Sequence, residues 1–215
     1  MNILFVCTGN TCRSPLAEAL VRQKSGATIQ VKSAGVHAMD GMLMSEGSRA
    51  ALANRGISEN HRAQLVNEEL LQWADVVLTM TESHKRLLLE RFPYAYEKVS
   101  TLKEYVYNDA GTKDKLEKIK HHIAQLELKK ATFLANNQGK VDEFNEKNEI
   151  PNQEKFEQEL LKLLKPDQEA IEQLESELPS FDVADPYGGS LPVYEATLKE
   201  IEAAVEKLLE QVNKK

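Results

Sequence analysis

Short apolar runs alternate with amphipathic segments over the first half of the chain. Residues 2–7 contain four consecutive apolar positions, which is typical of a central parallel strand that is buried on both faces. Further strands are predicted at 27–35, 75–80 and 98–106, and helical patterns occur at 15–24, 45–56, 67–74 and 81–92. Strands that alternate with helices over short connections predict an α/β fold with a doubly wound parallel sheet.

Residues at the ends of the predicted helices support this interpretation. Ser14 is the predicted N-cap of the first helix, with Pro15 at its first position. Gly56 is expected to close the second helix in the left-handed conformation. Near the end of the chain, Ile201 and Val205 belong to the buried face of a last amphipathic helix.

The pattern changes between residues 112 and 180. This segment is rich in Lys, Glu, Gln and Asn, and its first apolar stripe follows a heptad-like spacing. A second stripe begins after Pro151 and is interrupted at Pro166. We predict an antiparallel helical hairpin with a broken second arm, inserted into one discontinuous domain made of residues 1–111 and 181–215. The alternative for this segment is a largely disordered charged loop.

Composition and charge argue against several classes of protein. The net charge of −7 and the 28% of charged residues argue against a nucleic-acid partner. The sequence contains no apolar stretch long enough for a membrane span, and its two cysteines do not form a disulfide framework of the secreted type. We therefore expect a cytoplasmic monomer with neither nucleic-acid nor membrane partners.

The first strand runs into the segment CTGNTCR, in which Cys7 and Arg13 are separated by five residues. This spacing lets the backbone curl around one tetrahedral anion, while the following helix adds its positive N-terminal end. Arg13 can bind two phosphoryl oxygens, and the same surroundings favour the thiolate of Cys7 as a nucleophile. The residues expected to bind the phosphate are Thr8, Gly9, Asn10, Thr11, Cys12 and Ser14.

Alternatives remain open for single residues of this loop. Cys7 could be only a small buried residue at the end of a strand. Gly9 and Asn10 are residue types that tolerate a positive φ in a tight loop. Ser14 either offers its hydroxyl to the thiolate or only caps the helix. A nucleotide-binding P-loop is excluded because the sequence lacks G-x-x-x-x-G-K-[ST].

The segment DVADPYGGS, residues 182–190, supplies a candidate proton donor. Asp185 precedes Pro186, which favours a turn, and the two glycines that follow let the loop lie close to a pocket. Asp182 is the competing candidate, but no rigid turn follows it. The alternative role for Asp185 is that of a residue in an Asp-Pro turn.

These two loops resemble those of the low-molecular-weight protein tyrosine phosphatase family. CTGNTCRS is similar to its nucleophile loop and DPYGGS to its general-acid loop, and the likeness covers about 1–111 and 181–215. The tyrosine-specific members usually carry an aliphatic residue where this chain has Thr11, so CTGNTCRSP looks more like the protein arginine phosphatase branch. A Thr11 hydroxyl can also accept a hydrogen bond from a guanidinium N–H group. The alternative for Thr11 is a residue that only fills the loop.

The resemblance implies a role for each matching residue. Cys7 would be the nucleophile, Arg13 the phosphate clamp and Asp185 the general acid and then base. Supporting roles would fall to Asn10, Ser14, Ser33 and Tyr187. We expect no metal and no cofactor, and we interpret His61 and His84 as packing residues.

The leading functional hypothesis is a cysteine-dependent phosphatase that hydrolyses phosphoarginine in proteins through a phosphocysteine. Phosphotyrosine is the alternative substrate. Arsenate reduction is disfavoured because no cysteine follows Cys12, and a non-hydrolytic phosphoryl carrier would not need an in-line acid. The insertion is a candidate site for partner binding, and phosphorylated proteins are the expected partners.

Overall fold

The computed structural model describes residues 1–26, 28–107, 110–139 and 153–213. It divides into two compact units, one formed by Met1–Tyr107 with Phe181–Lys215 and the other by Asn108–Ser180. The second unit therefore interrupts the first along the chain. Within the described ranges, no helix has the length and apolar character needed to cross a membrane.

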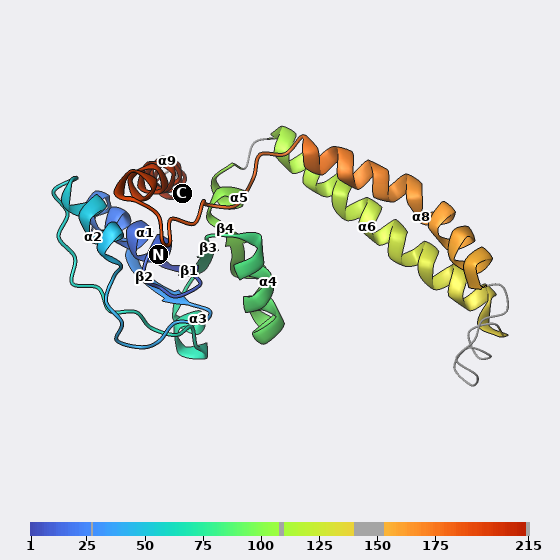
Figure 1. Ribbon diagram of the computed structural model, residues 1–215, viewed down its shortest axis with the longest axis horizontal. Helices are drawn as coiled ribbons and strands as arrows, with labels where there is room; N and C mark the ends of the chain where they lie inside the picture. Colours follow the sequence, from blue (N-terminus) through green and yellow to red (C-terminus); the bar gives the residue numbers. More distant parts are fainter. Residues whose placement is uncertain (27, 108–109, 140–152, 214–215) are drawn as a thin grey trace. The chain divides into compact units, whose positions relative to one another are not determined.

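A four-stranded parallel sheet forms the centre of the first unit (Figure 1). Its strands are β1 (Asn2–Cys7), β2 (Gln30–Gly35), β3 (Val76–Thr79) and β4 (Val99–Thr101), in the spatial order β2-β1-β3-β4. From β1 the chain continues to β2 on one side of β1, and then crosses to β3 and β4 on its other side. The strand order therefore reverses between β1 and β3. This arrangement confirms the predicted doubly wound α/β fold.

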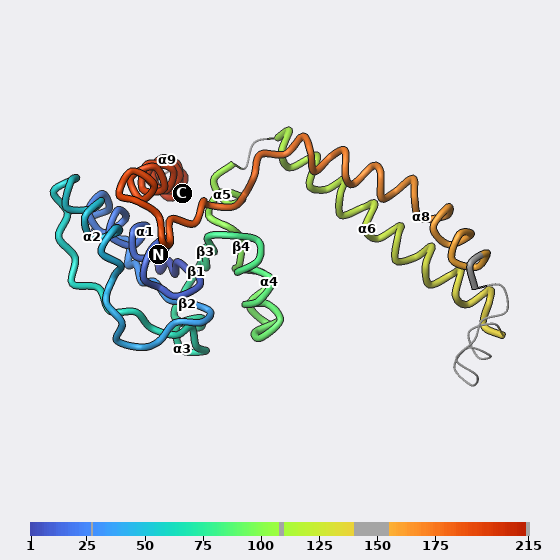
Figure 2. The backbone as a smooth tube through the Cα atoms, in the orientation of Figure 1, coloured from blue at the N-terminus to red at the C-terminus, as the bar shows by residue number. Residues whose placement is uncertain are grey.

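Helices cover both faces of this sheet. They are α1 (Arg13–Lys24), α2 (Glu46–Ala53), α3 (Glu68–Trp73), α4 (Glu82–Arg91), α5 (Leu102–Val106) and α9 (Leu191–Asn213), with a 3-10 helix at Pro93–Lys98. Ile3 and Phe5 of β1 belong to one core with residues of α1, α2, α5 and α9. Leu4 and Val6 belong to a second core with residues of α3 and α4. Figure 2 shows α9, from the end of the chain, lying beside α1 from its beginning.

The predicted strand at 98–106 is only partly correct. The strand ends at Thr101, and the following residues form the short helix α5. The Thr101 hydroxyl accepts a hydrogen bond from the Glu104 N–H, and the Glu104 carboxylate accepts one from the Thr101 N–H. This capping box stabilises the start of α5. The β-branched residues of the segment had favoured a strand in the prediction from sequence.

The described residues of the second unit include two long helices, α6 (Ala110–Asn136) and α8 (Gln153–Ser176), which run side by side (Figure 1). The expected break in the second arm is wrong, because α8 continues through Pro166. The next residue, Asp167, is buried against α6, where it pairs with Lys129 at 2.5 Å and with His122 at 2.9 Å. We attribute the continuous helix to these contacts, which hold it where proline removes one backbone hydrogen bond. Most of the predicted polar connection, residues 140–152, lies outside the described residues.

Candidate active site

The loop that follows β1 lies where the order of the strands reverses. Cys7 is the last residue of β1, and α1 begins six residues later at Arg13. In open α/β sheets, ligands bind beyond the carboxyl ends of the strands at this reversal point. The N-terminus of α1 faces the same loop and favours an anion there.

Ser14 lies beside the candidate nucleophile. Its Oγ is 3.0 Å from the Cys7 Sγ, and both residues are buried. The prediction that Ser14 caps the helix is wrong, because Cys12 is the cap residue and makes no side-chain cap hydrogen bond. Asn10 Nδ2 donates to Ser14 Oγ at 2.9 Å, which leaves the hydroxyl proton for Cys7 Sγ or the Ala34 carbonyl. The hydroxyl is therefore placed to donate to a thiolate.

Asn10 fixes the shape of the loop. It has a φ of 53°, in the left-handed region, whereas Gly9 lies outside that region. Its Oδ1 accepts a hydrogen bond from the Gln64 N–H at 2.9 Å, and its Nδ2 also donates to Ser33 Oγ at 2.8 Å. Asn10 is fully buried and forms hydrogen bonds with three neighbours. These hydrogen bonds offset the free-energy cost of the left-handed backbone conformation.

A second group of buried polar residues supports Asn10. Ser33 Oγ donates to Glu18 Oε2 at 2.5 Å, and a ring nitrogen of His61 lies 2.8 Å from the Asn10 carbonyl oxygen. Gly35 allows β2 to approach the loop, because a Cβ there would lie 2.4 Å from the Thr8 carbonyl oxygen. Glu18 was missed by the sequence reasoning, although a carboxylate within the small and apolar segment PLAEALV was a usable signal.

Arg13 is oriented towards the same loop. Its Nη2 donates to Asp185 Oδ2 at 2.8 Å, and its Nη1 donates to the Val183 carbonyl at 3.3 Å. Its Nε is buried and has no hydrogen-bond partner among the described residues. A buried donor without a partner costs free energy, and a bound phosphoryl oxygen would satisfy it.

The loop before α9 places Asp185 opposite Arg13. Asp185 Oδ1 accepts a hydrogen bond from the Tyr187 N–H at 3.2 Å, and Gly188 has a φ of 76°. These features fix the turn that the Asp-Pro sequence predicted. Asp182, the competing candidate, instead accepts a hydrogen bond from the Glu82 N–H at the start of α4.

The two loops enclose a pocket of about 210 Å³. Its lining residues are Cys7, Thr8, Gly9, Thr11, Cys12, Arg13, Asp185 and Tyr187. The remaining predicted residues, Asn10, Ser14 and Ser33, are fully buried and hydrogen-bonded to one another behind the loop. Tyr187 is 80% exposed and forms part of the rim. A buried thiol, a guanidinium and a carboxylate thus meet at one cavity, which is the arrangement required for phosphoryl transfer to sulfur.

Comparison of the sequence with known protein families gives a result that agrees with this geometry. The family model described as low molecular weight phosphotyrosine protein phosphatase matches residues 2–127 and 145–215. The chain belongs to this family.

Two relatives are named protein-arginine-phosphatase. One, from Geobacillus stearothermophilus, is 47% identical over 109 residues, which cover 51% of this chain and 74% of the relative. The other, from Bacillus subtilis, is 39% identical over 148 residues, covering 60% of this chain and 98% of the relative. The sequence likeness to proteins of this name therefore extends over half of the chain or more.

A solved structure of similar fold is that of a YwlE arginine phosphatase, a C7S mutant with a phosphorylated active-site serine. It superposes with a TM-score of 0.63 and 28% identity, and the match covers 100% of this chain and 97% of that one. In that relative, the residue introduced in place of cysteine carries the phosphate.

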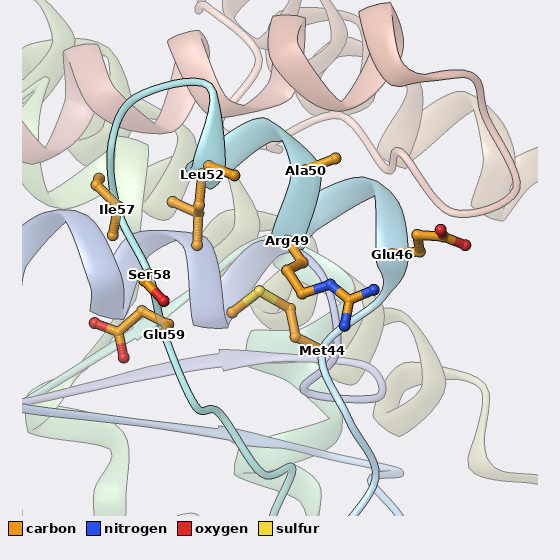
Figure 3. Close-up of a pocket in the computed structure, with 9 residues that line it drawn as sticks. Met44, Glu46, Arg49, Ala50, Leu52, Ile57, Ser58 and Glu59 are labelled. Atoms are coloured by element: carbon orange, nitrogen blue, oxygen red, sulfur yellow. The ribbon is translucent and has the colours of Figure 1, made fainter.

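This member of the phosphatase family has a second, larger pocket of about 380 Å³ (Figure 3). Met44, Leu52 and Ile57 are among its apolar lining residues, and Arg49 and Glu59 are charged residues that also line it. The lining includes no cysteine and no residue of the CTGNTCR loop. The larger pocket therefore lacks the thiol that phosphoryl transfer to sulfur needs, whereas the smaller pocket contains one.

His84 is a packing histidine with a specific contact to this phosphatase loop. One ring nitrogen lies 2.8 Å from the Thr8 hydroxyl and the other 2.8 Å from the Thr81 hydroxyl. Burial, and then the nearby charge of Arg13, lowers the pKa of His84 to about 4. The imidazole is therefore neutral at neutral pH and links the start of α4 to the loop.

We expect the neutral His84 to make the fold sensitive to acid. Its pKa is about 6.5 in an unfolded chain, so only the unfolded state takes up this proton as the pH falls from about 6.5 to about 4. The free energy of unfolding should therefore fall over this window. Urea unfolding at pH 7 and at pH 4.5 measures how much unfolding free energy is lost between the two pH values. This loss should be smaller in His84→Gln than in the wild type by about 1–2 kcal/mol, allowing for partial solvent screening.

The matched control is His121→Gln, which removes an exposed imidazole outside this network. It should leave the difference between the two pH values as large as in the wild type. Equal acid sensitivity in wild type and His84→Gln would contradict the assignment.

Proposed function

We propose that this protein is a cysteine-dependent phosphatase that hydrolyses phosphoarginine in proteins through a phosphocysteine intermediate. The observation that carries the proposal is the meeting of Cys7, Arg13 and Asp185 at one small pocket. All three belong to the unit formed by Met1–Tyr107 and Phe181–Lys215. We assign catalysis to that unit and treat the other as an insertion that is not needed for hydrolysis.

In the first step, the Cys7 thiolate attacks phosphorus. The S–P bond forms while the P–N bond to the guanidine breaks, and the protonated Asp185 gives its proton to the leaving nitrogen. Arg13 Nη2 lies 2.8 Å from Asp185 Oδ2, and its buried Nε, which has no hydrogen-bond partner among the described residues, can donate to a phosphoryl oxygen of the substrate. The guanidinium then stabilises charge on the equatorial oxygens.

In the second step, water hydrolyses the phosphocysteine. Asp185, now a carboxylate, takes a proton from the water as its oxygen attacks phosphorus. The S–P bond breaks and inorganic phosphate leaves, which regenerates the Cys7 thiolate. The Ser14 hydroxyl, 3.0 Å from the Cys7 Sγ, stabilises sulfur as a leaving group by donating a hydrogen bond to it. The backbone amides of the loop and the N-terminus of α1 act in the same direction.

Thr11 supports phosphoarginine as the substrate. It lines the pocket, and a phosphoarginine side chain brings guanidine N–H groups close to the loop. The threonine hydroxyl can accept one of these hydrogen bonds, whereas an aliphatic residue would leave the donor unpaired at a cost of about 1–3 kcal/mol. The names of the two relatives agree with this choice.

Phosphotyrosine is the second candidate substrate. The name of the family and the position of Tyr187 favour it, because an exposed aromatic ring at the rim can stack on the ring of a phosphotyrosine. Arsenate reduction is not supported. Arsenate reductases that share this loop use further resolving cysteines, whereas Cys7 and Cys12 are the only cysteines of the sequence.

The experiment that tests the proposal separates hydrolysis from phosphoryl binding. A protein phosphorylated on arginine is incubated with the full chain, and released inorganic phosphate is counted per enzyme molecule. A phosphatase releases many phosphates per chain. Transfer of no more than one phosphoryl group per chain, retained as phosphocysteine without release of inorganic phosphate, would instead indicate a carrier and contradict the proposal.

A further inference from the structure

The contact between α6 and α8 leaves part of their apolar surface uncovered. Ile119 of α6 and Phe156 of α8 are buried between the helices, and the rings of Phe133 and Phe156 lie 4.9 Å apart. Ile123 and Leu161 are nevertheless 48% and 58% exposed. Each helix thus has more apolar positions than its contact with the other helix buries.

Most of these additional apolar residues lie on one side of the hairpin, although Leu128 and Leu163, 60% and 39% exposed, lie outside it. Successive residues of a helix are rotated by about 100° about the helix axis. Each residue can therefore be given an angle relative to the seam, the line along which the two helices contact each other. In an antiparallel pair, residues rotated in the same sense from the seam project to the same side. The residues so placed are Leu116, Ile123 and Leu134 of α6 and Leu161, Leu164 and Ile171 of α8, which we call the open face.

The other side of the seam has more polar residues. His122 and Lys129 of α6 are rotated in the opposite sense, and both contact the carboxylate of Asp167. Both oxygens of the Asp167 carboxylate thus have a partner within the hairpin. The open face is therefore the side that can gain most by burying apolar surface.

Charged residues line the two edges of the open face. Lys113, Lys120 and Glu127 follow one another at seven-residue intervals along the edge of α6, and Glu175, Glu172 and Lys165 lie along the edge of α8. The contacts Lys115–Glu177 at 3.1 Å and His122–Asp167 at 2.9 Å give the register of the hairpin. This register places Lys113 level with Glu175, Lys120 level with Glu172, and Glu127 level with Lys165.

We propose that the open face binds the same face of a second copy of this chain, forming a four-helix bundle. A two-fold axis along the hairpin places α6 of one copy over α8 of the other at the same height. Lys120 then faces Glu172 of the partner subunit, and the other two levels also pair opposite charges. Within its own helix Lys120 contacts Glu117 at 2.8 Å, and this exposed ion pair contributes little to stability.

The dimensions of the open face fit such an interface. The 24 residues of α8 span about 36 Å at 1.5 Å per residue, and two helices of about 10 Å diameter are about 20 Å wide. The resulting area, on the order of 700 Å², approaches the roughly 800 Å² that one partner buries in a specific complex. A dimer would replace the monomer expected from the sequence.

The test measures the mass of the full-length chain by sedimentation over a range of protein concentrations. We expect a dimer for the wild type and for the charge-swapped double variant Lys120→Glu/Glu172→Lys. The single variant Lys120→Glu introduces two repulsive contacts per dimer and should weaken association at least about tenfold. Ile123→Lys places a charge within the open face and should give a monomer. Circular dichroism and para-nitrophenyl phosphate hydrolysis, both unchanged, would show that each variant is folded.

A wild-type chain that stays monomeric at all concentrations would overturn the proposal and would assign the open face to a different protein. Failure of the double variant to regain the dimer lost in Lys120→Glu would overturn the proposed pairing. A dimer that persists in Ile123→Lys would place the interface elsewhere on the chain.

Discussion

Replacing Cys7 with serine is expected to abolish turnover. A serine hydroxyl is almost fully protonated at neutral pH and is a poorer leaving group than a thiolate, so both chemical steps are slowed. Removing a nucleophile from a site in which the groups act together costs on the order of 10⁶-fold in kcat. The Cys7 side chain is 2% exposed and touches the Ser14 hydroxyl, so the smaller oxygen atom can be accommodated without rebuilding the loop. The measurement is the initial rate of phosphate release from para-nitrophenyl phosphate.

Cys12→Ser is the matched control, since it makes the same substitution within the same loop. Cys12 Sγ donates a hydrogen bond to Ser45 Oγ at 3.3 Å, and a serine hydroxyl can do the same. We expect Cys12→Ser to lose far less activity than Cys7→Ser. Comparable rates in the two variants would show that neither sulfur is the nucleophile.

The second large effect is expected for Asp185→Asn. The single amide oxygen can still accept the hydrogen bond from the Tyr187 N–H or the one from Arg13, but the amide cannot donate a proton to the leaving group or take one from water. Loss of general acid–base catalysis should lower kcat by roughly 10²–10⁴-fold. The loss should be largest for a phosphoarginine peptide, because a guanidine nitrogen needs protonation more than the nitrophenolate of the model substrate does.

Asp182→Asn provides the control for this prediction. Asp182 is three residues away in the same loop and accepts a hydrogen bond from the first N–H of α4, a contact that an asparagine can keep. We expect its kcat to stay within a few-fold of the wild type. A larger loss in Asp182→Asn than in Asp185→Asn would exchange the roles of the two residues.

The pattern of the sequence was sufficient to predict the sheet and most of its helices. The buried run at 2–7 is β1, and Gly56 has the positive φ of 72° expected at the end of the second helix. Such features depend on neighbouring residues, so they can be recognised locally. The turn at Asp185 and the C-x5-R loop were recognisable for the same reason.

Contacts between residues far apart in the sequence could not be predicted in this way. The hydrogen bond between Asn10 and the Gln64 N–H joins residues 54 positions apart, and the contact of Thr8 with His84 spans 76 positions. No periodicity records these pairs, because they depend on how β1, β2 and β3 meet. The role of Ser14 depends on the same tertiary arrangement, which turns its hydroxyl towards Cys7 instead of the helix N-terminus.

Pro166 shows a different limit. Proline within an apolar stripe predicts a break, and this local preference is strong. The helix continues through Pro166, and we attribute this to Asp167, the next residue, which contacts Lys129 and His122 of the neighbouring helix. Their spacing along α6 is visible in the sequence, but it identifies a partner only once the antiparallel register is known.

The central claim, hydrolysis of phosphoarginine, is tested most directly by the ratio of kcat/KM for matched phosphoarginine and phosphotyrosine peptides. The ratio should be measured for the wild type and for Thr11→Ile, which replaces a hydroxyl that lines the pocket with an aliphatic group. We expect the wild type to prefer phosphoarginine and the variant to shift the ratio towards phosphotyrosine by about ten- to a hundred-fold, as a lost hydrogen bond of about 1–3 kcal/mol implies. A wild-type preference for phosphotyrosine, with the same ratio in Thr11→Ile, would contradict the account.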